Sequence, residues 1–237
     1  MLKTSRYPVI DCIRGGAIIA MMLYHFGFDL NMQGYIAQDI NHNATWQVAR
    51  SLILGTFLFV AGFSISLAAN QNIKRRLIRL VRISACAILV SISSYFMFPD
   101  SWIFFGVLHF VVVGSLICWL VMPHKKLLFT LGILLLALGL FYQSPVFNQP
   151  LLQWVGMMTY KPITEDYVPL LPWLGVMMIG VGIGQWTLTK KDILLFDDKP
   201  STVLFPVQWL GRHSLIVYML HQPIFLAALY IFGMVYK

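Results

Sequence analysis

Long apolar runs separated by short polar segments occupy nearly the whole chain, and this pattern constrains the fold more than any other feature. The 237 residues are 59% hydrophobic and only 11% charged, whereas roughly 25% of residues are charged in an ordinary soluble domain. A helix needs about 20 apolar residues to cross a bilayer. We therefore expect an all-α, polytopic integral membrane protein of about seven transmembrane helices, forming a single domain over residues 1–237.

The apolar runs predict spans near 9–30, 47–69, 77–97, 102–121, 127–143, 168–186 and 205–235. The last run is long and is expected to begin with an interfacial piece around Phe205 to Gly211. The proline-rich stretch 145–172 is predicted to be a structured outer loop that could roof a cavity.

The basic residues predict the orientation, because cytoplasmic loops are enriched in Lys and Arg. With the N-terminus inside, 13 of the 17 basic residues lie on or near the cytoplasmic side, against three outside (Arg50, Lys161 and Lys237), while Arg14 lies within the membrane. The thirteen are Lys3, Arg6, Lys74, Arg75, Arg76, Arg79, Arg82, Lys125, Lys126, Lys190, Lys191, Lys199 and Arg212. This topology accounts for the net charge of +8, so no nucleic-acid partner is expected.

The first predicted span contains four polar groups that are costly to place in a membrane. Asp11, Arg14, His25 and Asp29 are separated by three, eleven and four residues. At about 100° per residue these spacings put all four on one face of a helix, with Arg14 and His25 about 16 Å apart along its axis. Intramembrane Asp, Arg and His are functional candidates by default.

Two interpretations of this face stay open. Asp11 and Arg14 could form a purely structural i,i+3 ion pair at the inner interface. That pair would not account for His25, which has Asp29 one turn beyond it, the spacing at which a carboxylate orients or charges an imidazole.

Other polar candidates lie on later segments. His109 is expected about seven residues in from the outer end of the fourth span, at a depth similar to that of His25. Tyr218 and His221 share a face of the last span, where catalysis and an interhelical hydrogen bond are equally good interpretations. His42 in the first outer loop and Asp166 before the sixth span are placed over the outer mouth. No metal-ligand spacing such as His-x-x-x-His is present, so no metal is expected.

A basic face precedes the third span, formed by Lys74, Arg75, Arg76, Arg79 and Arg82. Such a face usually sets topology and binds lipid phosphates. It is also what a cytosolic polyanionic cofactor would need.

Four motifs in this order resemble the heparan-α-glucosaminide N-acetyltransferase catalytic family and its small bacterial members. They are Arg6-Tyr7-Pro8-Val9-Ile10-Asp11-Cys12-Ile13-Arg14-Gly15-Gly16-Ala17, Met21-Met22-Leu23-Tyr24-His25-Phe26-Gly27-Phe28-Asp29-Leu30, Phe105-Gly106-Val107-Leu108-His109, and Gly211-Arg212-His213-Ser214-Leu215-Ile216-Val217-Tyr218-Met219-Leu220-His221-Gln222-Pro223. Arg14, ten intervening residues and His25 also match the arginine–histidine motif of the wider transmembrane acyltransferases that acylate glycans.

The resemblance implies transfer of an acetyl group from cytosolic acetyl-CoA to a hydroxyl or amine of a sugar on the far side of a bacterial inner membrane. It implies a central histidine: His25, or His42, which precedes Trp46 by four residues, one position displaced from the family's spacing. Neutral imidazole near pH 7 can act as the base or carry the acyl group.

The implied roles combine the motifs with the layout of the spans. Asp29 would orient His25, and His109 would act as a second acid/base or oxyanion stabiliser. Arg14 would hold the phosphopantetheine arm or a pyrophosphate oxygen, and Arg75, Arg76, Arg79 and Arg82 the nucleotide phosphates. Asp11, Asp166, Tyr218 and His221 are further polar candidates. Membrane lipid is an expected partner, and a homo-oligomer is left open.

Two other functions are compatible with buried Asp, Arg and His. A proton-coupled small-molecule transporter uses such groups as a relay, but would spread them over several broken helices near the midplane. Here they concentrate on one helix, which favours catalysis. An inactive accessory subunit, whose buried charges pair with a partner helix, is the third alternative.

Overall fold

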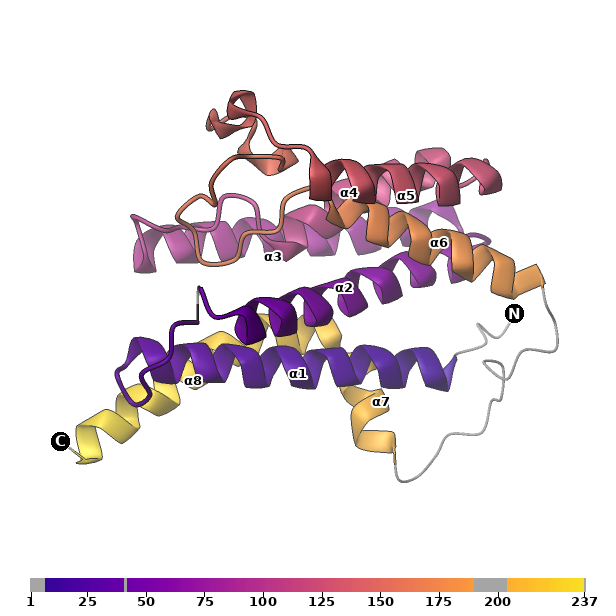
Figure 1. Cartoon of the computed structure of the whole chain (residues 1–237). Coiled ribbons are helices and arrows are strands. Elements are labelled where there is room, and N and C mark those ends of the chain that lie inside the picture. The colour runs from indigo at the N-terminus through magenta and orange to yellow at the C-terminus, as the bar shows by residue number, and fades with distance from the viewer. Residues whose placement is uncertain (1–6, 41, 190–203, 237) are drawn as a thin grey trace. The chain divides into compact units, whose positions relative to one another are not determined.

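The computed structural model describes residues 7–40, 42–189 and 204–236, and these residues form helices and loops without a strand. The helices are α1 (Pro8–Met32), α2 (Ala44–Leu67), α3 (Ile73–Met97), α4 (Val107–Val121), α5 (Lys125–Phe141), α6 (Trp173–Thr189), α7 (Phe205–Arg212) and α8 (Ser214–Tyr236), with short 3₁₀ turns at Pro145–Asn148 and Gln153–Val155 (Figure 1). The predicted all-α class is confirmed for these residues, and each predicted span overlaps at least one of these helices. Lys3, Arg6, Lys190, Lys191 and Lys199, part of the predicted inner-face charge, lie outside the described residues.

Four of the described helices, α1, α2, α3 and α8, are long and apolar enough to cross a membrane. The apolar helices α4, α5 and α6 are shorter, with 15, 17 and 17 residues. At 1.5 Å per residue α4 is about 22 Å long, less than the roughly 30 Å hydrocarbon core. The chain is therefore a helical membrane-type protein, while the number of spans and the inward N-terminus stay predictions.

The fourth predicted span begins five residues later than expected, at Val107 instead of residue 102. The backbone before Val107 is not helical: the Ile103 N–H donates to the side chain of Ser94 at 2.9 Å (Oγ), and Gly106 has an extended conformation. His109 is consequently the third residue of α4. The prediction that it lies seven residues in from the end of the helix is wrong. The sixth span likewise begins at Trp173 rather than 168, because prolines disfavour helix in the residue before them.

The last predicted span is divided at His213 into α7 and α8. The last hydrogen bond of α7 runs from the His213 N–H to the Trp209 carbonyl at 3.0 Å, and α7 ends at Arg212. The predicted separate piece at Phe205 to Gly211 is therefore confirmed as a helix of its own.

The predicted outer loop is ordered by hydrogen bonds along its own chain. The Leu170 and Leu171 N–H groups donate to the carbonyls of Trp154 and Val155 at 2.8 and 2.9 Å. The Tyr167 hydroxyl donates to the Gln153 carbonyl at 2.5 Å, and burial raises the pKa of this phenol. A structured loop is confirmed.

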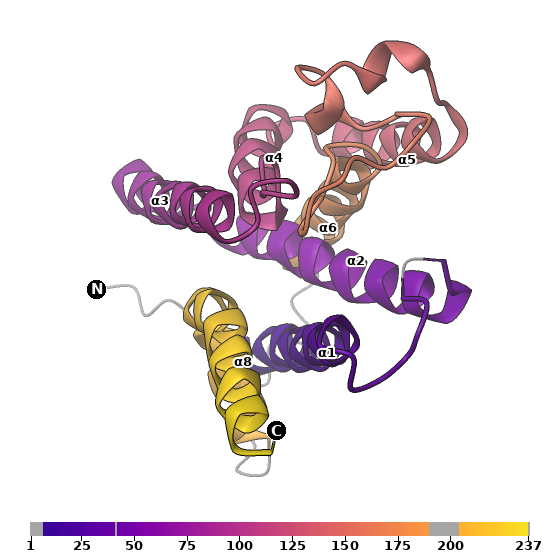
Figure 2. The same cartoon turned by 90° about the vertical axis from the view of Figure 1, so that its left-hand side faces the viewer.

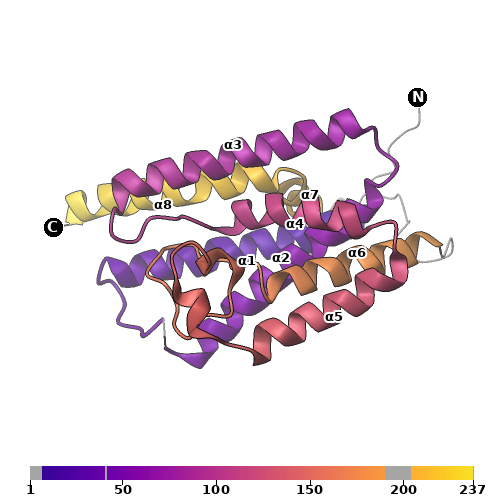
Figure 3. The ribbon, with the colours of Figure 1, turned by 90° about the horizontal axis from the view of Figure 1, so that it is seen from above.

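By Cα proximity the chain divides into two compact units, one formed by residues 1–57 with 192–237 and the other by residues 58–191. The first contains α1, α7, α8 and the beginning of α2, and the second the end of α2 with α3 to α6. In the first unit α8 lies beside α1 and α7 packs against α1 (Figure 2). In the second unit α5 and α6 run side by side (Figure 3). The single domain over 1–237 stays a prediction.

Glycines allow α1 and α7 to approach backbone to backbone. A Cβ atom on Gly15 would collide with the Val207 carbonyl oxygen, and one on Gly211 would collide with the carbonyl oxygen of Asp11. Small residues at helix crossings are the usual route to close packing in membranes, where apolar side chains gain little from leaving lipid. The short helix α7 is thereby held against the N-terminal part of α1.

Replacing Gly15 with leucine should therefore separate α1 from α7. We expect Gly15→Leu to lower the free energy of unfolding by about 1–3 kcal/mol, as overpacking does elsewhere. Thermal unfolding of the purified protein in detergent measures the change. The matched control is Gly16→Leu, because a Cβ at Gly16 meets nothing within 4 Å. Equal destabilisation by both substitutions would show that the α1–α7 contact is not the cause.

Candidate active site

Asp11 lies between two arginines near the N-terminal end of α1. Arg14 Nη1 donates to Asp11 Oδ1 at 3.3 Å, and Arg212 Nε from the end of α7 donates to Asp11 Oδ2 at 3.0 Å. Arg14 Nη1 also donates to the Gly211 carbonyl at 3.3 Å. The Asp11 side chain is only 13% exposed. The i,i+3 pair considered for Asp11 and Arg14 is present, but it belongs to a three-residue group with one excess positive charge.

Two histidines meet between α1 and α8. The ring centroids of His25 and His221 are 5.0 Å apart, with an interplanar angle of 62°. His221 Nδ1 lies 2.6 Å from the Tyr218 carbonyl oxygen. Because a carbonyl only accepts, the neutral His221 ring carries its hydrogen on Nδ1, and Nε2 keeps the lone pair.

Asp29 lies one turn beyond His25 and is completely buried. Its Oδ1 accepts a hydrogen bond from Gln222 Nε2 at 2.7 Å. Asp29 as the orienting partner of His25 stays a prediction, and the hydrogen bond that the structure shows comes from α8.

These contacts confirm that the four polar residues of α1 share one face. Asp11 and Arg14 meet α7, while His25 and Asp29 meet α8. Sequence reasoning missed two of the partners, Arg212 and Gln222. Both lie in the last of the four family-like motifs, and Gln222 directly follows His221, so that motif was the available signal.

Aromatic rings pack next to His25 within the first unit. The Tyr24 ring is edge-on to His25 at 5.9 Å and to Trp46 at 5.4 Å between centroids. The Trp46 ring lies so close to Gly27 that a Cβ there would be 2.8 Å from it. The beginning of α2 therefore lies against α1 beside His25.

His42 has a different environment, in the turn before α2. Its side chain is 84% exposed, and Nδ1 lies 2.9 Å from Asp39 Oδ1. Catalysis by His42 stays a prediction.

His109 and Asp166 both accept hydrogen bonds from backbone N–H groups at the N-terminal end of α4, in the second unit. His109 Nδ1 accepts from the Gly106 N–H at 3.2 Å, so Nε2 carries the hydrogen and donates to Ser91 Oγ at 3.1 Å. Asp166 Oδ2 accepts from the Val107 N–H at 3.1 Å. These bonds satisfy backbone donors that a helix end leaves open. An acid/base role for His109, and a cavity shared with His25, stay predictions.

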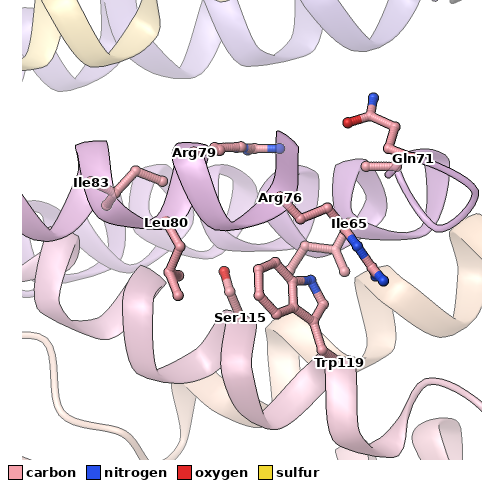
Figure 4. A pocket seen from close by; sticks show the side chains of 9 residues that line it. Ile65, Gln71, Arg76, Arg79, Leu80, Ile83, Ser115 and Trp119 are labelled. Atoms are coloured by element: carbon pink, nitrogen blue, oxygen red, sulfur yellow. The ribbon is translucent and has the colours of Figure 1, made fainter. Parts of the chain in front are cut away.

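Two residues of the predicted basic face line a small open hollow at the beginning of α3. Figure 4 shows Arg76 and Arg79 there, with Trp119 of α4 below Arg76. Arg75 and Arg82 are exposed and are not among the lining residues. Trp119, on the facing helix, was missed because it reads as one more apolar residue of a span.

Among residues 7–40, 42–189 and 204–236 no group of three or more His, Cys, Asp or Glu side chains could hold a metal ion. The Asp11 group, the His25–His221 pair and the Arg76–Arg79 hollow are instead clusters of ionisable side chains in the described structure.

The fold and these contacts define the class: a helical membrane-type protein with charged residues paired along α1 and a histidine pair between α1 and α8. The model of the heparan-alpha-glucosaminide N-acetyltransferase catalytic family matches residues 6–223. The chain belongs to this family, which confirms the resemblance and points to a membrane acetyltransferase. Neither the curated proteins nor the solved structures yielded a match.

Asp11→Asn should destabilise the protein by removing the charge that holds Arg14 and Arg212 together. Charge-assisted hydrogen bonds in a partly buried setting predict a loss of about 1–3 kcal/mol in the free energy of unfolding. Thermal unfolding in detergent tests this. The matched control is Asp39→Asn, whose partner His42 is exposed; we expect less than about 1 kcal/mol there, as for other surface pairs. A loss at Asp11 no larger than at Asp39 would contradict the prediction.

Proposed function

We propose that the protein is a histidine-dependent acetyltransferase that moves an acetyl group from cytosolic acetyl-CoA to a hydroxyl or amine of a sugar at the outer face of a bacterial inner membrane. Membership of the family supports the reaction class. The observation that carries the histidine assignment is the contact of His25 with His221, at 5.0 Å between ring centroids. It pairs the family-like histidine of α1 with a second imidazole from the last family-like motif.

In a direct transfer, His25 takes the proton from the acceptor O–H or N–H as the acceptor attacks the thioester carbonyl carbon. The tetrahedral intermediate then expels the thiolate of CoA, and the imidazolium returns the proton to sulfur. In a covalent transfer, the imidazole nitrogen itself attacks the thioester carbonyl carbon and expels the thiolate of CoA, which takes the proton that the ring loses. The acceptor O–H or N–H then attacks the acetyl group, and its proton goes to the imidazole as this leaves. His221 lies where it can share the proton in either route, with Tyr218 holding its tautomer.

The remaining polar groups have roles that follow from their positions. Asp29, with its hydrogen bond from Gln222, lies one turn from His25 and would orient its ring. Arg14, with the excess charge of the Asp11 group, offers a site for the phosphopantetheine arm or a pyrophosphate oxygen. His42, His109 and Asp166 remain candidates for the acceptor side.

Binding of acetyl-CoA to the detergent-purified protein is the first test of this function. Calorimetry should show saturable binding of acetyl-CoA, competed by CoA, because both carry the same phosphates. Absence of binding to stably folded protein would contradict an acetyl-CoA-dependent reaction and favour the proton-coupled transporter.

His25→Ala should abolish transfer while leaving the donor bound. General acid–base catalysis contributes roughly 10²- to 10⁴-fold, so acetylation of a sugar acceptor in reconstituted vesicles should fall by about that factor. Calorimetry of acetyl-CoA serves as the folding check. His124→Ala is the matched control, because His124 is exposed at the beginning of α5. Full activity of a folded His25→Ala protein would show that this assignment is wrong.

A further inference from the structure

The hollow at the beginning of α3 lies wholly within the second unit. Arg76, Arg79, Leu80 and Ile83 line it from α3, Ser115 and Trp119 from α4, and Ile65, Ala68 and Gln71 from the end of α2 and the turn after it. Two arginines, a glutamine and a serine are therefore among the lining residues, and no Asp or Glu is. Figure 4 shows these side chains together.

No acidic residue of this unit neutralises the two arginines. Within residues 58–189 the only carboxylates are Asp100, Glu165 and Asp166. Asp100 follows the far end of α3, and Asp166 caps α4 there. From Arg76 to Met97 the helix alone extends about 30 Å, several times the Debye length in physiological salt. This end of the unit therefore carries an excess of positive charge.

The environment of the Arg76 side chain favours binding of an anion. Its Cζ lies 5.3 Å from the centre of the Trp119 ring, a cation–π distance that holds the guanidinium over the ring. Its Nε is buried without a hydrogen-bond partner among the described residues. A buried donor of this kind calls for an acceptor, and the planar fork of Arg matches phosphate oxygens in bidentate fashion.

We propose that this hollow binds a phosphate ester, held by Arg76 over Trp119 and by Arg79, with Gln71 and Ser115 as further donors. The phosphate belongs either to the nucleotide end of CoA or to the headgroup of an anionic lipid. For the CoA source the inference rests on the proposed function; for the lipid source it does not. The exposed Arg75 and Arg82 attract the anion at longer range.

The test compares Arg76→Gln with Arg75→Gln, two neighbouring substitutions that remove the same charge. Calorimetry with CoA measures the first source. Native mass spectrometry of the protein in uncharged detergent, with added phosphatidylglycerol, measures the second. We expect binding of at least one of the two probes to weaken by about tenfold or more in Arg76→Gln and by less than about threefold in Arg75→Gln, since a lost charge-assisted hydrogen bond is worth at least that.

Two more conservative substitutions test whether a loss of binding in Arg76→Gln comes from misfolding. Arg76→Lys keeps the charge but removes the fork, and Trp119→Leu removes the ring under it, so both should weaken binding of the same probe. Equal weakening by Arg75→Gln and Arg76→Gln would overturn the proposal in favour of diffuse surface charge. Wild-type affinity for both probes in Arg76→Gln, or no binding of either probe to the wild type, would also overturn it.

Acetyl transfer measured on the same variants separates this inference from the proposed function. If the wild type transfers acetyl groups and Arg76→Gln binds both probes with wild-type affinity, the hollow is not the site and the function stands. If the wild type neither binds CoA nor transfers acetyl groups, but retains phosphatidylglycerol in an Arg76-dependent way, the phosphate site stands and the proposed function fails.

Discussion

A carboxylate removed from water needs hydrogen-bond donors, and this requirement determines which helices lie against α1. An isolated buried charge is far more costly than any contact that α1 gains from apolar packing. Asp29 is completely buried and takes a donor from Gln222 on α8. Asp11 takes donors from Arg14 and from Arg212 on α7. The two carboxylates are five turns apart on one face, and their donors on other helices come from two successive elements, α7 and α8.

The same arrangement sets the environment of the histidine pair. His221 is on α8 next to Gln222, so the hydrogen bond from Gln222 to Asp29 also fixes the register at which His221 meets His25. The glycine contacts between α1 and α7 hold the other end of α1 at its closest approach. Polar pairing thus selects the partner helix, and small residues set its distance, a division of roles common in membrane proteins.

Apolar run length and helical periodicity were enough to predict the helices and the polar face of α1, because both depend on sequence-local geometry. The beginning of α4 was not predictable in this way, since it depends on Ser94 and Asp166, which lie on other elements. Gln222 and Trp119 were missed for a related reason. Gln222 stands beside a proline, and Trp119 stands in an apolar run. The role of either residue becomes visible only when the facing helix is known. The family-like motifs contained Arg14, Arg212 and Gln222, which donate to Asp11 and Asp29, although their pairing required coordinates.

The polar partners of α1 are far from it along the chain. Asp11 and Arg212 are separated by 201 residues, and Asp29 and Gln222 by 193. During synthesis α1 is made long before either partner leaves the ribosome. Its carboxylates must therefore be sheltered by water, lipid headgroups or the insertion machinery until α7 and α8 arrive. Assembly of this site is a late event in biogenesis, and a protein lacking its last two helices would present quality control with a charged, uncompensated first helix.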